Sequence, residues 1–214
     1  MYLAGDAGDE EFVKKAVEIV TGPDGLGGCD ILVNSQGINK KMWSWEIETD
    51  FFEKMLHTNV TSLMLTCKYF GNWMKDHNLE GDEYAAPASG QPNTNKGYGK
   101  IINIGSMLSF QGGKFIPSYA ASKHGVAGLT KAFASEMGAY NVQINAIAPG
   151  YIKTENTAPI RADKARNDEI LERIPARHWA EPYELMGIAV FLASDASNYI
   201  NGAIIPVDGG YLVS

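Results

Sequence analysis

The sequence predicts an α/β fold in which helices cover both faces of a parallel sheet. Short apolar runs alternate along the chain with longer segments whose apolar residues have helical spacing. The short runs are continuously apolar rather than alternating, which is typical of strands buried on both faces, as in a parallel sheet. This alternation predicts a doubly wound sheet within a single domain that spans residues 1–214.

The expected strands are short apolar runs that end at polar or turn-forming residues. They cover residues 29–34, 100–104, 142–148 and 202–207, and residues 1–4 resemble the end of another strand. In parallel sheets, ligands bind outside the carboxyl ends of the strands. We therefore expect the functional site at the residues that follow these runs, namely Asp6, 34–37, 105–106 and 148–154.

The expected helices have apolar residues three and four positions apart, or a high content of helix-forming residues. They cover residues 10–20, 50–73, 118–139, 161–173 and 184–193. Residues 76–99 interrupt this pattern with Pro, Gly and Asn, and we interpret them as a polar loop at the amino ends of the strands.

The composition is typical of a soluble globular protein, with 45% hydrophobic and 20% charged residues among 214. A net charge of -7 without a basic block argues against nucleic-acid or membrane partners. The two cysteines form no disulfide framework, and the four histidines lack metal-ligand spacing, so no metal is expected. No signal peptide and no membrane-spanning apolar run is apparent, which favours a cytoplasmic location.

Three residues carry the predicted chemistry. Tyr119 and Lys123 are four positions apart in a helix and therefore share a face. An ammonium group beside a phenol lowers the phenol pKa, which makes tyrosine a usable acid and base near neutral pH. Ser106 follows the strand at 100–104, and its hydroxyl can hold a substrate oxygen whose charge changes. Ser106 as a turn cap is the structural alternative.

The chain resembles the short-chain dehydrogenase/reductase family, which has a Rossmann-like fold and transfers hydride between NAD or NADP and a hydroxyl or carbonyl carbon. The resemblance runs from residue 6 to residue 210. It rests on the segments Asn34-Ser-Gln-Gly37, Asn59, Ser106, Tyr119-Ala-Ala-Ser-Lys123 and Pro149-Gly-Tyr-Ile-Lys-Thr154.

The resemblance implies a role for each catalytic residue. Ser106 orients the substrate oxygen, Tyr119 is the acid and base, and Lys123 lowers the tyrosine pKa and binds the nicotinamide ribose. Asn59 holds a water molecule that connects Lys123 to solvent, although it can also simply kink the 50–73 helix, because Asn is a poor helix former.

The resemblance also implies the cofactor contacts. Asp6 reaches the adenine, with a helix N-cap as the alternative. Asn34 and Gly37 lie beside the adenosine ribose, where Ser35 and Gln36 depart from the family pattern. The remaining implied contacts are with the nicotinamide half of the cofactor. They come from Tyr119, Lys123, Pro149, Gly150, Ile152 and Thr154.

The family's opening strand, its Gly-rich phosphate loop and its second strand are not recognisable in this sequence, so we expect an N-terminally truncated sheet that lacks its first two strands. The second strand carries the residue that selects NAD or NADP, so this preference is left open. Without the family's first two strands, the apolar edge of the strand at Ile31 to Val33 would be exposed. Whether such a chain binds dinucleotide is doubtful on this ground.

Residues 151–182 correspond to the family's substrate lid. This segment resembles those of 2-deoxy-D-gluconate 3-dehydrogenases and gluconate 5-dehydrogenases, which implies a sugar-acid substrate. Arg161, Arg177 or His178 can pair with its carboxylate, with a surface charge or a helix-end cap as the alternative for each of them. A 3-oxoacyl carrier-protein reductase and a truncated, non-catalytic interaction subunit are the alternatives. The family resemblance further implies a homotetramer through the 50–73 and 118–139 helices.

Overall fold

The computed structural model describes residues 1–77 and 99–214. Four parallel strands form one sheet in the order β1-β2-β3-β4, with bounds Ile31–Asn34, Gly99–Ile104, Val142–Pro149 and Ile204–Val207. The predicted parallel α/β fold is confirmed. Most of the predicted loop at 76–99 lies outside the described residues, and its ends belong to α3 and β2.

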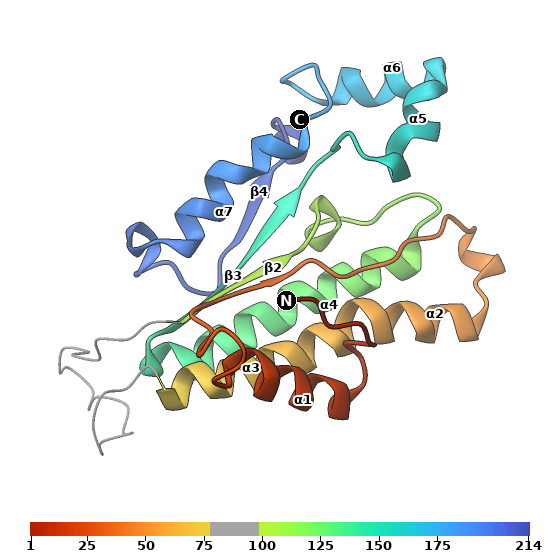
Figure 1. Cartoon of the computed structure of the whole chain (residues 1–214). Coiled ribbons are helices and arrows are strands. Elements are labelled where there is room, and N and C mark those ends of the chain that lie inside the picture. Colours follow the sequence, from red (N-terminus) through yellow and green to blue (C-terminus); the bar gives the residue numbers. More distant parts are fainter. Residues whose placement is uncertain (78–98) are drawn as a thin grey trace.

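Helices cover both faces of the sheet (Figure 1). On one face lie α1 (Glu10–Thr21), α3 (Ser62–His77) and α4 (Pro117–Met137), and α7 (Met186–Ala193) lies on the other. Each face has its own apolar core. One joins Leu63, Phe70 and Ile144, and the other joins Ile102, Ile147 and Leu192.

The predicted 50–73 helix is divided into three parts. Helix α2 (Thr49–Leu56) continues through a π-helical turn (His57–Thr61) into α3. A π-helical turn contains one extra residue and changes the direction in which its side chains project. The turn contains Asn59, which the sequence predicted either as a site residue or as the cause of a kink.

The predicted 161–173 helix is also divided. Helix α5 (Ala158–Ala162) ends at Asp163, whose carboxylate accepts a hydrogen bond from the Arg166 backbone N–H and begins α6 (Lys164–Arg173). A side chain that caps a helix start competes with a continuous helix at that position. The predicted helix at 184–193 begins with a 3-10 turn (Pro182–Leu185) before α7.

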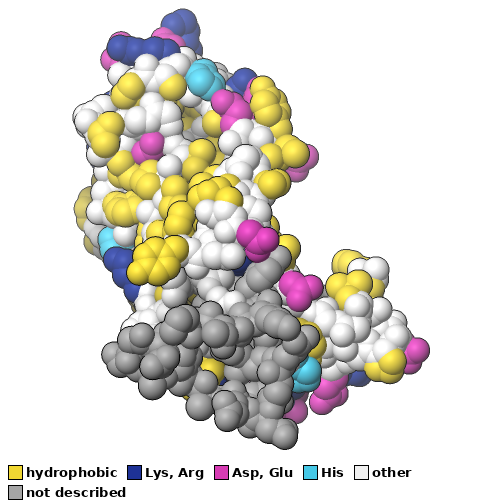
Figure 2. All heavy atoms as spheres, turned by 90° about the vertical axis from the view of Figure 1, so that its left-hand side faces the viewer, with side chains coloured by type: hydrophobic (Ala, Val, Ile, Leu, Met, Phe, Trp, Pro, Cys, Tyr) yellow, Lys and Arg dark blue, Asp and Glu magenta, His cyan; other side chains and the backbone are white. Residues whose placement is uncertain are grey.

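The prediction of a strand end at residues 1–4 is wrong, because this segment has no strand partner among the described residues. The predicted exposure of β1 is confirmed, since the Ile31 and Val33 side chains are 47% and 54% exposed. Further apolar residues are exposed along α7 and its flanks, on the side that Figure 2 shows. They are Tyr183, Met186, Val190 and Tyr199.

A buried polar network lies inside the sheet. The Asn34 side chain donates to the Asn103 side chain at 2.9 Å, and these two residues are directly paired between β1 and β2. Asn103 in turn donates to the Thr130 hydroxyl of α4 at 2.9 Å, and the Thr66 hydroxyl of α3 donates to Asn34 at 2.8 Å. The network connects two strands to both helices that cover them.

Among the described residues, no helix is long and apolar enough to cross a bilayer. Cys29 and Cys67 are buried free thiols, and burial raises their pKa values to about 11 and about 12. In the same part of the chain, no three His, Cys, Asp or Glu side chains come together as a metal site.

Candidate active site

Ser106 lies just beyond the carboxyl end of β2, where the chain leaves the sheet and enters a 3-10 turn (Met107–Ser109). Its hydroxyl accepts a hydrogen bond from the Leu108 backbone N–H at 3.2 Å, and the Ser109 hydroxyl accepts one from the Ser106 N–H at 3.2 Å. Ser106 is therefore a turn cap, as the structural alternative proposed, and is also buried at the predicted site. The turn-cap interpretation is confirmed, and the predicted contact with the substrate oxygen stays a prediction.

Helix α4 brings Tyr119 and Lys123 to the same place. Pro117 begins this helix, which suits proline because the first helical N–H needs no partner. The Lys123 Nζ lies 5.5 Å from the centroid of the Tyr119 ring and donates to the Ile104 carbonyl at 2.6 Å. The Ser109 hydroxyl donates to the Lys123 carbonyl at 2.9 Å, which fixes the turn after β2 against α4.

The Ser106 side chain faces the Tyr119 phenol and acts to lower its pKa, but burial has the larger effect and raises that pKa above its usual value. Lys123 is not among the groups that shift this pKa here, so the role predicted for Lys123 stays a prediction. The ammonium bonds the Ile104 carbonyl and lies over the ring rather than at the hydroxyl. Withdrawal from water disfavours phenolate, so the resting group is a neutral proton donor.

Lys123 is only 4% exposed, and burial lowers its pKa to about 8. An ammonium group has three hydrogen-bond donors. The Ile104 carbonyl takes one of them, so the remaining donors can bind hydroxyl groups of a ligand. Burying a cation without a neighbouring anion lowers the stability of the fold. Such buried, unpaired charges are common at functional sites.

Asn59 joins the site to the segment that follows β1. Its Nδ2 donates to the Ile38 carbonyl and to the Ser122 hydroxyl, both at 3.0 Å. Its Oδ1 accepts from the Ile38 N–H at 2.8 Å. A Cβ atom at Gly37 would lie 3.4 Å from this Oδ1 and 3.9 Å from the Lys123 Nζ. Asn59 therefore lies on the Lys123 side of the site, together with Gly37.

The other residues predicted at the adenosine side are arranged differently. The Asn34 side chain points into the buried network, so a ligand contact at this position would have to come from its backbone. Asp6 accepts from the Gly8 N–H at 2.8 Å and pairs with His57 at 3.2 Å, and both interactions lower its pKa. The alternative that Asp6 caps α1 is wrong, since the cap is Asp9.

The predicted nicotinamide segment follows β3. A Cβ atom at Gly150 would lie 2.6 Å from the Asp208 Cα, so only glycine allows β3 and β4 to end this close together. Ile152 forms a parallel bridge with Ala180, and its carbonyl accepts from the Thr157 hydroxyl at 2.8 Å. Thr154 caps the turn before α5. Pro149 ends β3, and these residues thus form the base of the predicted lid.

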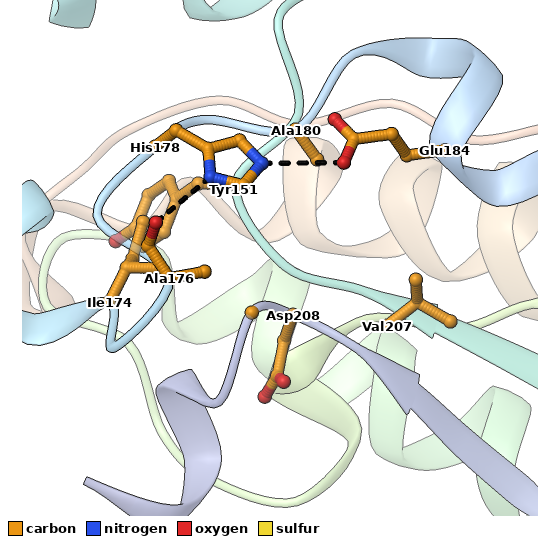
Figure 3. Close-up of a pocket in the computed structure, with 9 residues that line it drawn as sticks. Tyr151, Ile174, Ala176, His178, Ala180, Glu184, Val207 and Asp208 are labelled. Atoms are coloured by element: carbon orange, nitrogen blue, oxygen red, sulfur yellow. Dashed lines mark hydrogen bonds and ion pairs between the residues drawn. The ribbon is translucent and has the colours of Figure 1, made fainter.

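A cavity of about 240 Å³ lies beside this base (Figure 3). Tyr151, His178, Glu184 and Asp208 line it, whereas Ser106, Tyr119 and Lys123 do not. In Figure 3, His178 bridges the Ala176 carbonyl and the Glu184 carboxylate, at 2.9 Å and 3.3 Å. The cavity is thus separate from the predicted catalytic residues, and His178 is already paired.

The two lid arginines with predicted ligand roles differ in their contacts. Arg177 donates to the Glu172 carbonyl at 3.2 Å. Arg161 donates from Nη2 to the Thr154 carbonyl at 3.1 Å, but its Nε is buried and has no hydrogen-bond partner among the described residues. Its neighbour Ile160 packs on the apolar cluster that includes the Tyr119 ring. Of the two arginines, Arg161 is therefore the one with a buried N–H group that lacks an acceptor among the described residues.

Two supporting residues were missed in the sequence. Ser122 accepts from Asn59 and donates to the Tyr119 carbonyl at 2.8 Å, so it links the π-helical turn to α4. Ser109 links Ser106 to Lys123. The spacing of Ser106 and Ser109 is a capping-box pattern that could have revealed the second residue.

The fold and this group of side chains define a class of protein. The family described as enoyl-(acyl carrier protein) reductase matches residues 1–212. The chain belongs to the short-chain dehydrogenase/reductase family, as the motifs predicted.

Similar proteins share most of the chain. A 2-dehydro-3-deoxy-D-gluconate 5-dehydrogenase from Bacillus subtilis (strain 168) is 47% identical over 86% of this chain and 65% of its own length. The corresponding Escherichia coli (strain K12) protein is 44% identical over 87% of this chain and 67% of its own.

The chain is also similar to a solved structure. The crystal structure of a gluconate 5-dehydrogenase from Burkholderia cenocepacia J2315, in complex with NADP and tartrate, is similar with a TM-score of 0.86 and 30% identity, and the match covers 98% of this chain and 74% of that one. The chain thus spans about two thirds to three quarters of these relatives.

Proposed function

We propose that this protein transfers hydride between NAD or NADP and the hydroxyl-bearing or carbonyl carbon of a sugar acid, such as 2-deoxygluconate or gluconate. The observation that carries the proposal is the meeting of Ser106, Tyr119 and Lys123 at the carboxyl end of β2. The names of the similar proteins, which act on gluconate derivatives, support the substrate class.

The residues present fit a nicotinamide cofactor, because the buried Lys123 ammonium has donors to spare for ribose hydroxyls. Tyr119, Pro149, Gly150, Ile152 and Thr154 would hold the nicotinamide half. Asp6, Gly37 and the Asn34 backbone would hold the adenosine half. When bound, the nicotinamide ring supplies or accepts the hydride.

The protein's own groups would handle the proton. Tyr119 donates its phenolic proton to a carbonyl oxygen during reduction, or accepts one during oxidation. Ser106 donates a hydrogen bond to the same oxygen and stabilises its developing charge. Asn59 keeps a lone pair on Oδ1 beyond its bond to Ile38, which can hold the water that leads from Lys123 to solvent.

Initial rates test this function directly. We expect the protein to reduce NAD or NADP in the presence of 2-deoxy-D-gluconate or D-gluconate, and to act less well on sorbitol, which has the same length but no carboxylate. The absorbance of the reduced nicotinamide follows the reaction. A folded protein that turned over no sugar acid with either nucleotide would contradict the proposal and favour the non-catalytic alternative.

The description of the matching family favours a second candidate, a reductase of acyl chains on a carrier protein. A carrier protein is acidic and large, and a net charge of -7 does not attract it. Rates with acetoacetyl carrier protein, measured beside those with gluconate, separate the two candidates. Faster turnover of the acyl substrate would replace the sugar-acid assignment.

We further propose that Arg161 binds the substrate carboxylate, because its buried Nε–H has no acceptor and a buried donor in that state is unfavourable. In an Arg161→Gln variant, KM for gluconate should rise about tenfold or more, which is the cost of losing a charge-assisted hydrogen bond. KM for sorbitol should change little. Steady-state kinetics on both substrates measures the difference.

Arg166→Gln is the matched control for this prediction. Arg166 is in the same lid and has the same side chain, but it already forms an ion pair with Glu169. It should leave KM for gluconate unchanged. Equal losses for gluconate and sorbitol in the Arg161 variant would show that Arg161 shapes the lid and does not bind the carboxylate.

We also propose that the protein is a cytoplasmic homotetramer. The outward face of α4 exposes small residues at Ala121, Gly128 and Ala132, which allow another helix to approach closely. This supports a homotetramer that includes α3 and α4, in a cytoplasmic enzyme. Light scattering in solution gives the mass of the assembly.

A further inference from the structure

Two tryptophans are stacked on the surface in the segment that follows β1. The Trp43 and Trp45 rings lie 4.6 Å apart at an interplanar angle of 16°. They are 40% and 74% exposed, whereas Trp179 is buried and Trp73 packs against a core. The stacked pair therefore fills no core of the described chain. Large aromatic side chains left in water in this way are a feature of binding surfaces.

The pair is held against the segment that leads into α4. The edge of the Trp43 ring meets the Phe115 ring at 4.2 Å between centroids and 77° between planes. The Met42 N–H donates to the Phe115 carbonyl at 2.7 Å. Phe115 has a φ of 68°, which is strained for a residue with a side chain and must be maintained by its surroundings. We call Trp43, Trp45 and Phe115 the rim patch.

The rim patch is connected to the catalytic group at both ends. Phe115 comes just before α4, whose first two turns carry Tyr119 and Lys123. At the other end, the segment begins at Gly37 and Ile38, which lie against Lys123 and Asn59. In Figure 1 this segment, drawn in orange, reaches the end of α4 where the helix begins. The patch therefore lies at the edge of the proposed active site.

The chemistry of the patch suits a sugar acid. Indole rings offer broad apolar faces on which C–H groups of a sugar pack, and ligand sites generally combine such faces with a few polar groups. The Lys114 ammonium lies 5.3 Å from the centroid of the Phe115 ring, so a positive charge stands beside the apolar surface. A cation at the mouth of an acidic protein attracts an anionic substrate.

We propose that the rim patch is a substrate subsite in which the carbon chain of the sugar acid stacks on the Trp43 and Trp45 rings. This inference rests on the proposed function, since it assigns the substrate of the same site. It adds two residues that determine specificity through apolar contact, in contrast to the carboxylate contact assigned to Arg161.

The kinetic test uses the variant Trp45→Ala alone and combined with Trp43→Ala. KM for gluconate should rise about fivefold in the single variant and further in the double one, while kcat stays within about twofold, because contact with one aromatic ring contributes about this factor. KM for sorbitol should rise as well, since its C–H groups are the same. KM for propan-2-ol, which is too short to reach the patch, should not change.

The binding test needs no turnover. D-gluconate, titrated into the protein with its cofactor absent, should change the indole fluorescence in a saturable manner. The change should disappear in the double variant Trp43→Phe with Trp45→Phe. It should persist in Trp73→Phe, the matched control, because Trp73 is stacked on His77 at the far end of α3.

The two tests separate the failure of this inference from the failure of the proposed function. Fluorescence that responds to gluconate through Trp43 and Trp45, in a protein without turnover, would keep the subsite and reject the catalytic function. Turnover of gluconate with an unchanged KM in the tryptophan variants would overturn the subsite. Absence of any fluorescence response that depends on these two residues would overturn it as well.

Discussion

Replacing Tyr119 with Phe is expected to lower kcat for sugar-acid oxidation by about a thousandfold or more, within the range that a general acid and base contributes. The substitution removes only the phenolic oxygen that faces the Ser106 side chain. The ring stays in the apolar cluster between the turn after β2 and the lid, so the fold should be retained. Initial rates together with a thermal unfolding curve measure both effects.

Tyr183→Phe is the control for this substitution, because Tyr183 is 66% exposed in the turn before α7. It should leave kcat unchanged. If Tyr119→Phe retained more than about a tenth of the activity, tyrosine would not be the acid and base of this site. Loss of activity together with loss of the folded signal would point to packing as the cause.

Replacing Lys123 with Met should change how stability depends on pH. Burial lowers the pKa of Lys123 to about 8 in the folded protein, from 10.5 for a lysine in water. Below the folded pKa both states hold the proton, and the folded protein bears the full cost of a buried charge. Between the two pKa values the unfolded state binds more protons, so the wild-type stability rises with pH.

The Met variant lacks this titration. It should therefore be more stable than the wild type below about pH 8, by on the order of 3 kcal/mol, and the difference should fall away as the pH approaches about 10.5. Urea unfolding of both proteins at a series of pH values measures this difference in the free energy of unfolding. Lys131→Met, at an exposed position of the same helix, is the control. A constant difference at every pH would show that burial of the charge is not what Met removes.

The strands of this fold could be predicted because each is a short apolar run that a buried parallel strand requires. The breaks in the helices could not be predicted from the sequence. The π-helical turn at Asn59 depends on hydrogen bonds to Ile38 and Ser122, which are distant in the sequence. The break at Asp163 depends on whether its side chain caps a new helix, and spacing alone does not decide that.

Spacing and family motifs predicted that Ser106, Tyr119 and Lys123 would come together, and the structure places them near one another, but it could not be predicted how burial shifts their pKa values. Tyr119 was expected to have a lowered pKa, but burial raises it, and this burial depends on packing against residues that are distant in the sequence. Asn34 was expected beside the adenosine ribose, but the sequence could not show that its side chain bonds Asn103 and Thr66 and leaves only its backbone for such a contact. Asp6 and Asp9 precede the same helix, and the local turn decides which one caps it.

The amide pair of Asn34 and Asn103 has a consequence for the alignment of β1 with β2. If β1 slipped by one residue, the two side chains would project from opposite faces, and their polar groups would remain buried without partners. Purely apolar strands would tolerate such an error more easily. The pair thus fixes the register of β1 against β2, and with it the position of Gly37 relative to Ser106 at the carboxyl edge of the sheet.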